Sequence, residues 1–117
     1  MKEKDKKLLL IDLSARLPYS VKLNCCGTHG VMLQSIDSNG LINNDYDIDE
    51  VKPYLFPMSS MTEEQEVDFY NMECDYLDNI YGMVYSVELN WLNKNHFDYH
   101  NLIEKGLALD ATNLNIY

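Results

Sequence analysis

The hydrophobic period of the chain changes at Pro18, and this change restricts the fold more than any other feature of the sequence. Before it, residues 5–17 ("DKKLLLIDLSARL") place Leu8, Ile11 and Ala15 at helical spacing, and further leucines widen that face. Proline disfavours the helical conformation in the residue that precedes it. The start of the chain therefore predicts one helix over 5–17, with Leu8, Ile11 and Ala15 turned inward.

After Pro18 the apolar residues recur with period two. Residues 20–25 ("SVKLNC") alternate between apolar and polar side chains, which is typical of a half-buried strand. A second alternating segment covers 31–37 and a later one covers 46–51. Turn signals at 27–30 ("GTHG") and 37–40 ("DSNG") follow the first two segments. This order predicts a small antiparallel meander of three or four strands.

The chain beyond the meander predicts helices. Two prolines in 52–57 ("KPYLFP") predict the end of the sheet, because proline cannot donate to a strand ladder. Thr62 and Gln65 have the spacing of a capping box, which indicates a helix over about 62–78. Two further helices are predicted, over 87–95 and 99–105.

These elements together predict an α+β protein with an N-terminal helix, the antiparallel meander and three C-terminal helices. We expect a single domain over 1–117. In it, residues 1–57 hold the first helix and the sheet, and residues 58–117 form a helical half packed on them. The order of helix and meander also fits a small SH3-like or Sm-like barrel.

Acidic residues dominate the middle of the chain. The formal net charge is −10, and the stretch from Asp37 to Asp78 holds twelve acidic residues against one basic residue, Lys52. Such a field repels the phosphate backbone of nucleic acids. The charge therefore argues against direct nucleic-acid binding and favours a protein partner with a basic surface.

The stretch "NKNHFDYH" raises the question of a metal site, because two histidines four residues apart share one face of a helix. Asp98 favours a different interpretation, since it is a suitable N-cap for the helix over 99–105. His100 then lies in the first turn and His96 in the connection before it, so the two rings need not converge. No third ligand stands at a typical spacing, and we expect no metal and no other cofactor.

The three cysteines, Cys25, Cys26 and Cys74, make a poor disulfide framework. Adjacent residues of a strand point to opposite faces, so one of Cys25 and Cys26 should be buried and the other exposed. Cys25 or Cys26 could act as a nucleophile with His29 as its base, but no orienting carboxylate is close in sequence. We therefore expect reduced thiols, a cytoplasmic location and no enzymatic activity.

The acidic run "DYDIDE" (45–50) resembles the start of a calcium loop. However, Glu50 stands where such a loop needs glycine. In the alternative interpretation, Asp45, Asp47 and Asp49 line one solvated face of a strand and protect its edge from pairing. We favour this interpretation.

Four tyrosines, Tyr70, Tyr76, Tyr81 and Tyr85, cluster in one stretch. Tyrosine is common both at the rim of a core and in protein interfaces, so two interpretations stay open. Helical spacing would turn Tyr70 inward together with Val67. The candidate protein-binding residues are Asp45, Asp47, Asp49, Glu50, Tyr70, Tyr76, Tyr81 and Tyr85.

Three segments, "LLLIDLSARLPYSVKL", "IDEVKPYLFPMSSMTEEQ" and "WLNKNHFDYHNLIEKGLALDA", resemble a family of small proteins from gut Bacteroidales genomes, often within phages and other mobile elements. The resemblance is most specific at "KPYLFPMSSMTEE" and "HFDYHNLIEKGLA". The chain departs from the family pattern at Ser20, Phe56 and His100-Asn101, and the family has no histidine at position 100. The family carries no assigned activity. The resemblance therefore implies a setting, the cytoplasm and a mobile element or phage, rather than a mechanism.

We expect a non-enzymatic interaction module that binds another protein, as a phage or mobile-element accessory or inhibitor of a host process. One alternative is an acidic nucleic-acid mimic that blocks a DNA- or RNA-binding defence nuclease, which requires carboxylates spaced like phosphates. Another is a small barrel that binds RNA, although the charge opposes it. No apolar run is long enough to cross a membrane. The sequence leaves open the identity of the partner and the oligomeric state.

Overall fold

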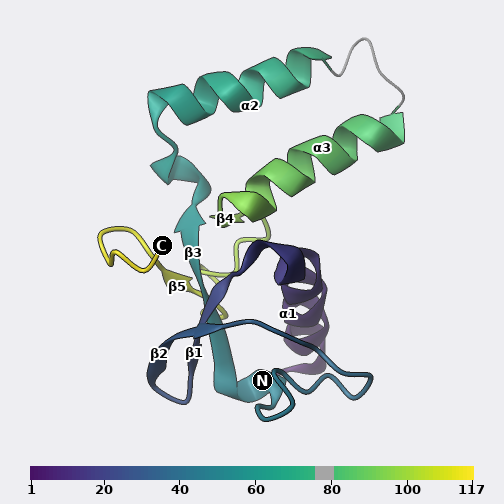
Figure 1. The fold of residues 1–117 in the computed structure, drawn as a ribbon, viewed down its shortest axis with the longest axis vertical. Helices are drawn as coiled ribbons and strands as arrows, with labels where there is room; N and C mark the ends of the chain where they lie inside the picture. Colours follow the sequence, from purple (N-terminus) through teal and green to yellow (C-terminus); the bar gives the residue numbers. More distant parts are fainter. Residues whose placement is uncertain (76–80) are drawn as a thin grey trace.

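The structure is a computed structural model that describes the backbone of residues 1–75 and 81–117 and the side chains of residues 1–71 and 88–117. Within these ranges the fold is α+β, with an N-terminal helix, a small mixed sheet and a pair of helices beyond one end of the sheet (Figure 1). The α-helices are α1 (Glu3–Arg16), α2 (Glu63–Asp75) and α3 (Tyr81–Lys94). The strands are β1 (Lys22–Cys25), β2 (Thr28–Met32), β3 (Val51–Pro57), β4 (Phe97–Asp98) and β5 (Leu109–Asp110).

β3 is the central strand of the sheet. The strand order is β2-β1-β3-β4, and β5 also pairs with β3. β1 is antiparallel to β2 and β3, whereas β4 and β5 run parallel to β3. The predicted antiparallel meander is therefore wrong for the later strands. Strands from both 1–57 and 58–117 build the same sheet.

Two prolines lie within β3, although we expected residues 52–57 to end the sheet. The Cys26 amide donates to the Glu50 carbonyl over 3.0 Å. Hydrogen-bonded and non-bonded pairs alternate along an antiparallel ladder, so Pro53, opposite Leu23, falls in a non-bonded pair. The prediction was wrong because proline interrupts a strand only where a neighbouring strand needs its amide.

β1 follows the predicted alternation, and its apolar side chains, Cys25 among them, are buried. Cys26 is exposed, which confirms that the two neighbouring cysteines face opposite ways. The turn is shorter than predicted, because Cys25 pairs with Thr28 and only Cys26 and Gly27 lie between them. Both have positive φ angles, 51° and 90°, as the two-residue hairpin turn of type I′ requires.

Residues 46–51 do not form the predicted strand. Ile48–Glu50 form a 3-10 turn instead, and Asp47 and Glu50 cap it reciprocally. The Asp47 amide donates to the Glu50 carboxylate over 3.1 Å. The interpretation that Asp45, Asp47 and Asp49 line one face of a strand is therefore wrong.

α1 covers nearly the predicted range but turns a different face inward. Leu9 and Leu13 are fully buried, whereas Ile11 is 62% exposed. Asp12 and Arg16 are buried beside the two leucines. The four buried residues lie at three- and four-residue spacing, so they form one face. The prediction is wrong for Ile11 and Ala15, which are exposed, whereas Leu8 packs partly against the core and two of the leucines that widened the predicted face are its buried centre.

The main core joins α1, the sheet and the segment after β4. Its members are apolar residues that lie far apart in the sequence and contact one another in the fold. They are Leu9, Leu13, Val21, Leu23, Cys25, Leu33, Ile42, Ile48, Val51, Leu55, Leu102, Leu107 and Ala108. This core holds β3 against α1 through Val51 and Leu55.

α2 and α3 form a helical pair at the end of β3 (Figure 1). The predicted capping box of α2 is confirmed: the Gln65 amide donates to Thr62 Oγ1 over 3.1 Å, and the Thr62 amide donates to Gln65 Oε1 over 2.9 Å. The predicted end of this helix near residue 78 lies outside the described residues. α3 begins at Tyr81, before the predicted start at residue 87.

Aromatic side chains attach this helical pair to the sheet. The Trp91 ring of α3 stacks on Phe97 of β4, with centroids 5.7 Å apart and planes at 16°. It also lies 5.6 Å from the Phe69 ring of α2. Trp91 of α3 therefore contacts both Phe69 of α2 and Phe97 of β4, and so joins the three elements.

The predicted helix over 99–105 does not form. Asp98 belongs to β4, and its carboxylate accepts the amides of Leu102 (2.8 Å) and Ile103 (2.9 Å). The chain between them turns instead of continuing as a helix, because Asn101 adopts a left-handed conformation with φ of 56°. Asp98 therefore accepts backbone amides as a helix N-cap does, but it does so from the end of strand β4.

Candidate functional site

The acidic residues of the middle segment form two separate surfaces. We call Asp45, Asp47, Asp49 and Glu50 the loop surface; all four are exposed. We call Glu63, Glu66, Val67 and Tyr70, which are exposed on α2, the helix surface. The loop surface precedes β3 and the helix surface follows it, so the length of this seven-residue strand, roughly 20 Å, lies between them (Figure 1).

The carboxylates of the loop surface already take part in bonds within the fold. The Cys26 thiol donates to the Glu50 carboxylate over 2.9 Å, and Asp47 caps the 3-10 turn. The bond from Cys26 lowers the pKa of Glu50, and the same bond raises the pKa of the Cys26 thiol. Asp49 lies 3.7 Å from the Lys6 ammonium group. The loop surface therefore helps to connect β1, α1 and the start of β3.

The helix surface combines apolar and acidic side chains. Val67 is 57% exposed and Tyr70 is 63% exposed, whereas Phe69 turns toward α3. On a helix, residues three and four apart are neighbours, so Glu63 lies beside Val67, Glu66 beside Tyr70, and Val67 beside Tyr70. The predicted inward orientation of Val67 and Tyr70 is wrong. The helix surface is an apolar pair with carboxylates along its side.

The other three tyrosines of the predicted cluster fall partly or wholly outside the description. Tyr76 lies outside the described residues. Tyr81 and Tyr85 belong to α3 by their backbone, and their side chains lie outside the described residues. The structure therefore places only Tyr70 among the four tyrosines that we expected to share a surface.

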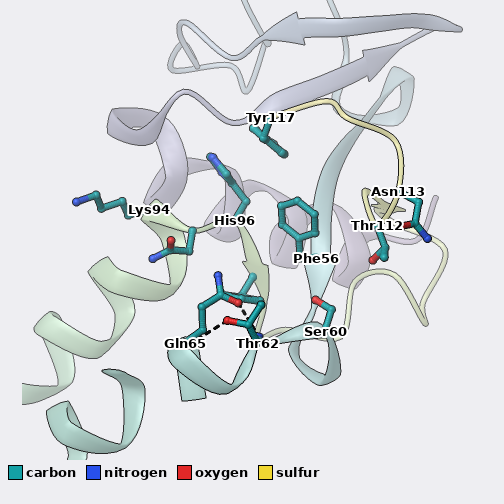
Figure 2. Close-up of a pocket in the computed structure, with 11 residues that line it drawn as sticks. Phe56, Ser60, Thr62, Gln65, Lys94, His96, Thr112, Asn113 and Tyr117 are labelled. Atoms are coloured by element: carbon teal, nitrogen blue, oxygen red, sulfur yellow. Dashed lines mark hydrogen bonds between the residues drawn. The ribbon is translucent and has the colours of Figure 1, made fainter. Parts of the chain in front are cut away.

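A pocket of about 410 Å³ opens at the junction of β3, α2, α3 and the C-terminal segment (Figure 2). Phe56, His96 and Tyr117 form its aromatic side, and Gln65, Asn95 and Asn113 contribute amide groups. Its volume is within the range of small-molecule sites in proteins. Sequence reasoning missed this pocket, because only the parallel pairing of β4 with β3 brings these residues together.

His96 occupies an unusual position in this pocket. Its ring stacks on Tyr117 with centroids 3.7 Å apart and planes at 12°, and its backbone has a positive φ of 62°. Within the described part of the chain, its buried Nδ1 atom has no hydrogen-bond partner. Burial, together with the positive charges of Arg16 and Lys22, lowers the pKa of His96 to about 4. His96 is therefore neutral at physiological pH.

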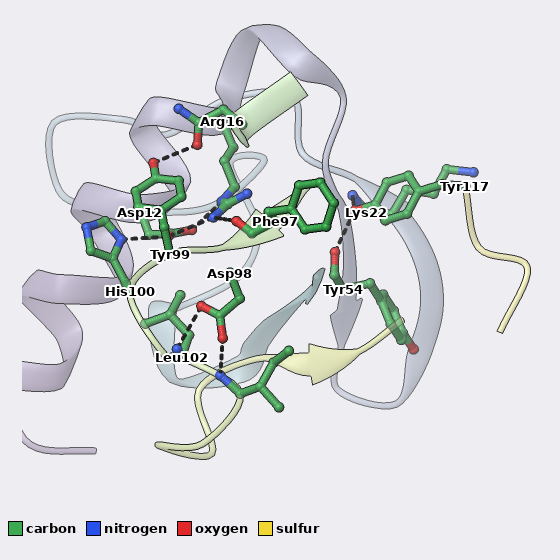
Figure 3. Close-up of polar contacts among 12 residues, drawn as sticks. Asp12, Arg16, Lys22, Tyr54, Phe97, Asp98, Tyr99, His100, Leu102 and Tyr117 are labelled. Carbon is green, nitrogen blue, oxygen red and sulfur yellow. Dashed lines mark hydrogen bonds and ion pairs between the residues drawn. The ribbon is translucent and has the colours of Figure 1, made fainter. Parts of the chain in front are cut away.

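A polar network lies next to Phe97, one of the residues that line the pocket (Figure 3). Arg16 Nε donates to Asp12 Oδ1 over 2.6 Å, and Arg16 Nη2 donates to the Phe97 carbonyl over 2.7 Å. His100 Nδ1 lies 2.8 Å from Asp12 Oδ2. Arg16 also lies over the Tyr99 ring, 5.0 Å from its centroid. The network attaches α1 to β4, and it pairs His100 with Asp12.

Tyr117 attaches the C-terminal segment to the sheet. Its hydroxyl donates to the Tyr54 carbonyl over 2.7 Å and accepts the Lys22 amide over 2.8 Å. Burial raises the pKa of Tyr117 to about 12. The Lys22 ammonium group donates to the Ile116 carbonyl over 2.8 Å. These bonds fix the aromatic wall that Tyr117 gives to the pocket.

Cys26 and His29, the pair that we considered as nucleophile and base, have different partners. Cys26 donates to Glu50, whereas His29 contacts the Tyr54 hydroxyl through Nδ1. Asn24 Nδ2 donates to the same Tyr54 hydroxyl over 3.2 Å and lies 3.1 Å from His29 Nδ1. The contact between His29 and Tyr54 therefore connects β2 with β3.

In the residues that the structure describes, no group of three or more His, Cys, Asp or Glu side chains converges as a metal site requires. No helix of the described chain is long and apolar enough to cross a membrane.

Comparisons of the chain with protein-family models, with curated proteins and with solved structures found no match.

Proposed function

We propose that the protein is a non-enzymatic interaction module whose helix surface binds a basic, partly apolar surface of another protein. The observation that carries this proposal is the exposure of Val67 and Tyr70 on α2, next to Glu63 and Glu66. Scattered exposed apolar residues are common on proteins. An apolar pair beside like charges is a more specific pattern, because interfaces have an apolar centre and a polar rim.

Charge and apolar area contribute to different steps of such an association. The α2 sequence, "EEQEVDFYNMECD", contains six acidic residues and no basic residue. Its field steers a basic partner and raises the association rate. Burial of Val67 and Tyr70 then lowers the dissociation rate, because desolvated aromatic and aliphatic side chains carry much of the binding energy.

The loop surface is a weaker candidate. Asp47 and Glu50 cap the 3-10 turn, Glu50 also accepts the Cys26 thiol, and Asp49 lies near Lys6. A partner that binds these carboxylates competes with bonds inside the fold. We therefore assign the recognition of the partner to the helix surface.

The separation of the two acidic surfaces also bears on the alternatives. A nucleic-acid mimic needs a continuous row of carboxylates, whereas here the length of β3 separates the two acidic surfaces. In a small barrel the sheet curls round on itself, whereas the strand path of the described residues ends at β2 and β4. These features favour a protein partner over both alternatives.

The resemblance to small proteins of gut Bacteroidales mobile elements supplies the setting of this proposal. We place the protein in the cytoplasm, as an accessory protein or inhibitor that acts on a basic protein of the host or of the element.

Site-specific photo-crosslinking tests the proposal. A photo-crosslinking amino acid at position 70 should capture a protein with a basic surface in host cells, and Glu63→Lys with Glu66→Lys should abolish the capture. The matched control carries the crosslinker at Ile11, which is 62% exposed on α1 and should not capture that protein. Equal capture from both positions, or capture that ignores the charge reversal, would contradict the proposal.

A further inference from the structure

The pocket beside His96 differs in charge from the rest of the protein. The chain has 19 acidic and 9 basic residues, yet the described residues that line the pocket include no Asp and no Glu. They include one basic residue, Lys94, at the rim. The pocket is therefore a local region of low negative charge in a strongly acidic molecule.

Two cations outside the lining, Arg16 and Lys22, are also close enough to His96 to affect its ring. Arg16 and Lys22 both act on His96 strongly enough to contribute to the low pKa of its ring. The Asp12 carboxylate compensates the charge of Arg16. Lys22 is held near the C-terminal segment by its bond to the Ile116 carbonyl. Lys94 is the cation that lines the pocket itself, and Lys22 lies outside the lining, near the C-terminal segment; both favour an anion over a cation at this site.

The walls of the pocket suit a flat ring. Phe56 lies 5.8 Å from the Tyr117 ring and 6.4 Å from the Phe97 ring, and Tyr117 stacks on His96. Offset and tilted arrangements at such distances are favourable for aromatic rings. Figure 2 shows Phe56, His96 and Tyr117 grouped on one side of the pocket, with Thr62 and Gln65 on another.

Polar groups at the pocket have capacity for a ligand. Gln65 uses its Oε1 atom to accept the Thr62 amide, so its NH2 group can donate elsewhere. Asn95 uses its NH2 group to donate to the Trp91 carbonyl, so its Oδ1 atom can accept. The Lys94 side chain points outward in Figure 2, and its flexible four-carbon stem allows the ammonium group to turn toward an anion.

We propose that this pocket binds a small planar aromatic molecule that carries one anionic group, a carboxylate or a phosphate. The ring lies against Phe56 and Tyr117, and the anionic group lies on the side of Lys94. This site is distinct from the helix surface, and its occupancy does not depend on the proposed protein partner. The ligand makes no covalent bond with the protein.

Two probes distinguish the sources of the anion: 2-naphthoate for a carboxylate and adenosine monophosphate for a phosphate. Adenosine and inorganic phosphate are the controls for the ring and the anion alone. Amide chemical shifts in 1H–15N NMR spectra should move at residues 94–97 and 112–117 with one or both probes. Each control should bind at least about tenfold more weakly, a difference of about 1.4 kcal/mol.

Variants connect the binding to the named residues. Lys94→Glu should weaken binding of the probe about fivefold to tenfold, whereas Lys52→Glu, on an exposed side chain of β3, should leave it unchanged. Bound anion should also raise the pKa of the His96 ring above about 4, as seen by titration of its NMR signals. Phe56→Leu should weaken binding while the folded NMR spectrum is retained.

Three results would overturn the proposal. The first is no shift at these residues with either probe at millimolar concentration. The second is equal binding of adenosine and adenosine monophosphate together with no binding of 2-naphthoate, because the anion would then play no part. The third is equal weakening by Lys94→Glu and Lys52→Glu, which would indicate a general effect of charge and not a site.

Discussion

Replacement of Asp12 by alanine should destabilise the protein strongly, because it leaves a buried guanidinium group without its carboxylate. Asp12 and Arg16 are both fully buried. The substitution removes the two contacts from Arg16, at 2.6 and 3.1 Å, and the contact with His100 at 2.8 Å. Arg16 then retains the Phe97 carbonyl and the Tyr99 ring. Loss of one partner of a buried ion pair costs about 3–5 kcal/mol.

Urea unfolding followed by the fluorescence of the single tryptophan, Trp91, measures this cost. The double variant Asp12→Ala/Arg16→Met should be more stable than the sum of the two single variants predicts, by about 2 kcal/mol. Ile11→Ala, on the exposed face of the same helix, is the control and should cost less than about 0.5 kcal/mol. Additive effects of the two substitutions would refute the coupling that we infer.

The pH dependence of the same variant gives a second check. Burial raises the pKa of Asp12, but hydrogen bonds from His100 and Arg16 and the charge of Arg16 outweigh it, so the pKa lies below its ordinary value of 3.8. The unfolded chain therefore binds the proton first as the pH falls. The stabilisation by Asp12 should be complete above pH 3.8 and should be lost below it.

Three further predictions concern other parts of the fold. Because burial and nearby cations lower the pKa of His96 from 6.5 to about 4, the unfolded chain binds this proton first. As the pH falls from 6.5 to about 4, the free energy of unfolding should decrease by about 1.4 kcal/mol per pH unit, roughly 3 kcal/mol in all. Urea titrations at several pH values measure this decrease, and the His96→Phe variant should lack it. Thr62→Ala should cost about 1 kcal/mol in thermal unfolding, because α2 loses its N-cap; no loss would mean that the helix end is not stabilised by this bond. Asp98→Ala should cost about 2–4 kcal/mol by urea unfolding, more than a typical cap, because the Leu102 and Ile103 amides both lose their acceptor; a cost equal to that of Thr62→Ala would contradict the buried geometry.

Sequence reasoning correctly predicted those parts of the fold that depend on residues close together in the sequence. The alternation of β1 places Cys25 inside and Cys26 outside because neighbouring strand residues always face opposite ways. The Thr62–Gln65 capping box forms because both bonds lie within one turn of chain. Asp37 likewise closes the predicted turn at 37–40, where the Gly40 amide donates to the Asp37 carbonyl.

The predictions that were wrong concern segments whose contacts lie far away in the sequence. "FDYHNLIEKG" has the residues of a helix start, but Phe97 and Asp98 instead pair with Phe56 and Pro57 as a parallel strand. The i,i+4 spacing of Asp12 and Arg16 is typical of a surface ion pair, but in the fold both side chains are fully buried and Arg16 bonds to the carbonyl of the distant Phe97.

The candidate site was predictable only in part, for the same reason. The acidic character of 37–78 is evident from the sequence, but its division into two surfaces depends on the position of β3 between them. The pocket residues Phe56, His96 and Tyr117 come from three segments, and no local pattern connects them.

The most direct test of the proposed function is the association rate with the basic protein captured at position 70, measured at about 50 and 300 mM salt. Two charge-reversed variants with the circular dichroism of the wild type are compared: Glu63→Lys/Glu66→Lys on the helix surface and Asp45→Lys/Asp49→Lys on the loop surface. We predict that salt slows the wild type about tenfold or more, that the helix-surface variant is slow at both concentrations, and that the loop-surface variant stays within about twofold of the wild type. An unchanged association rate for the helix-surface variant, or a larger loss for the loop-surface variant, would contradict the assignment of binding to α2.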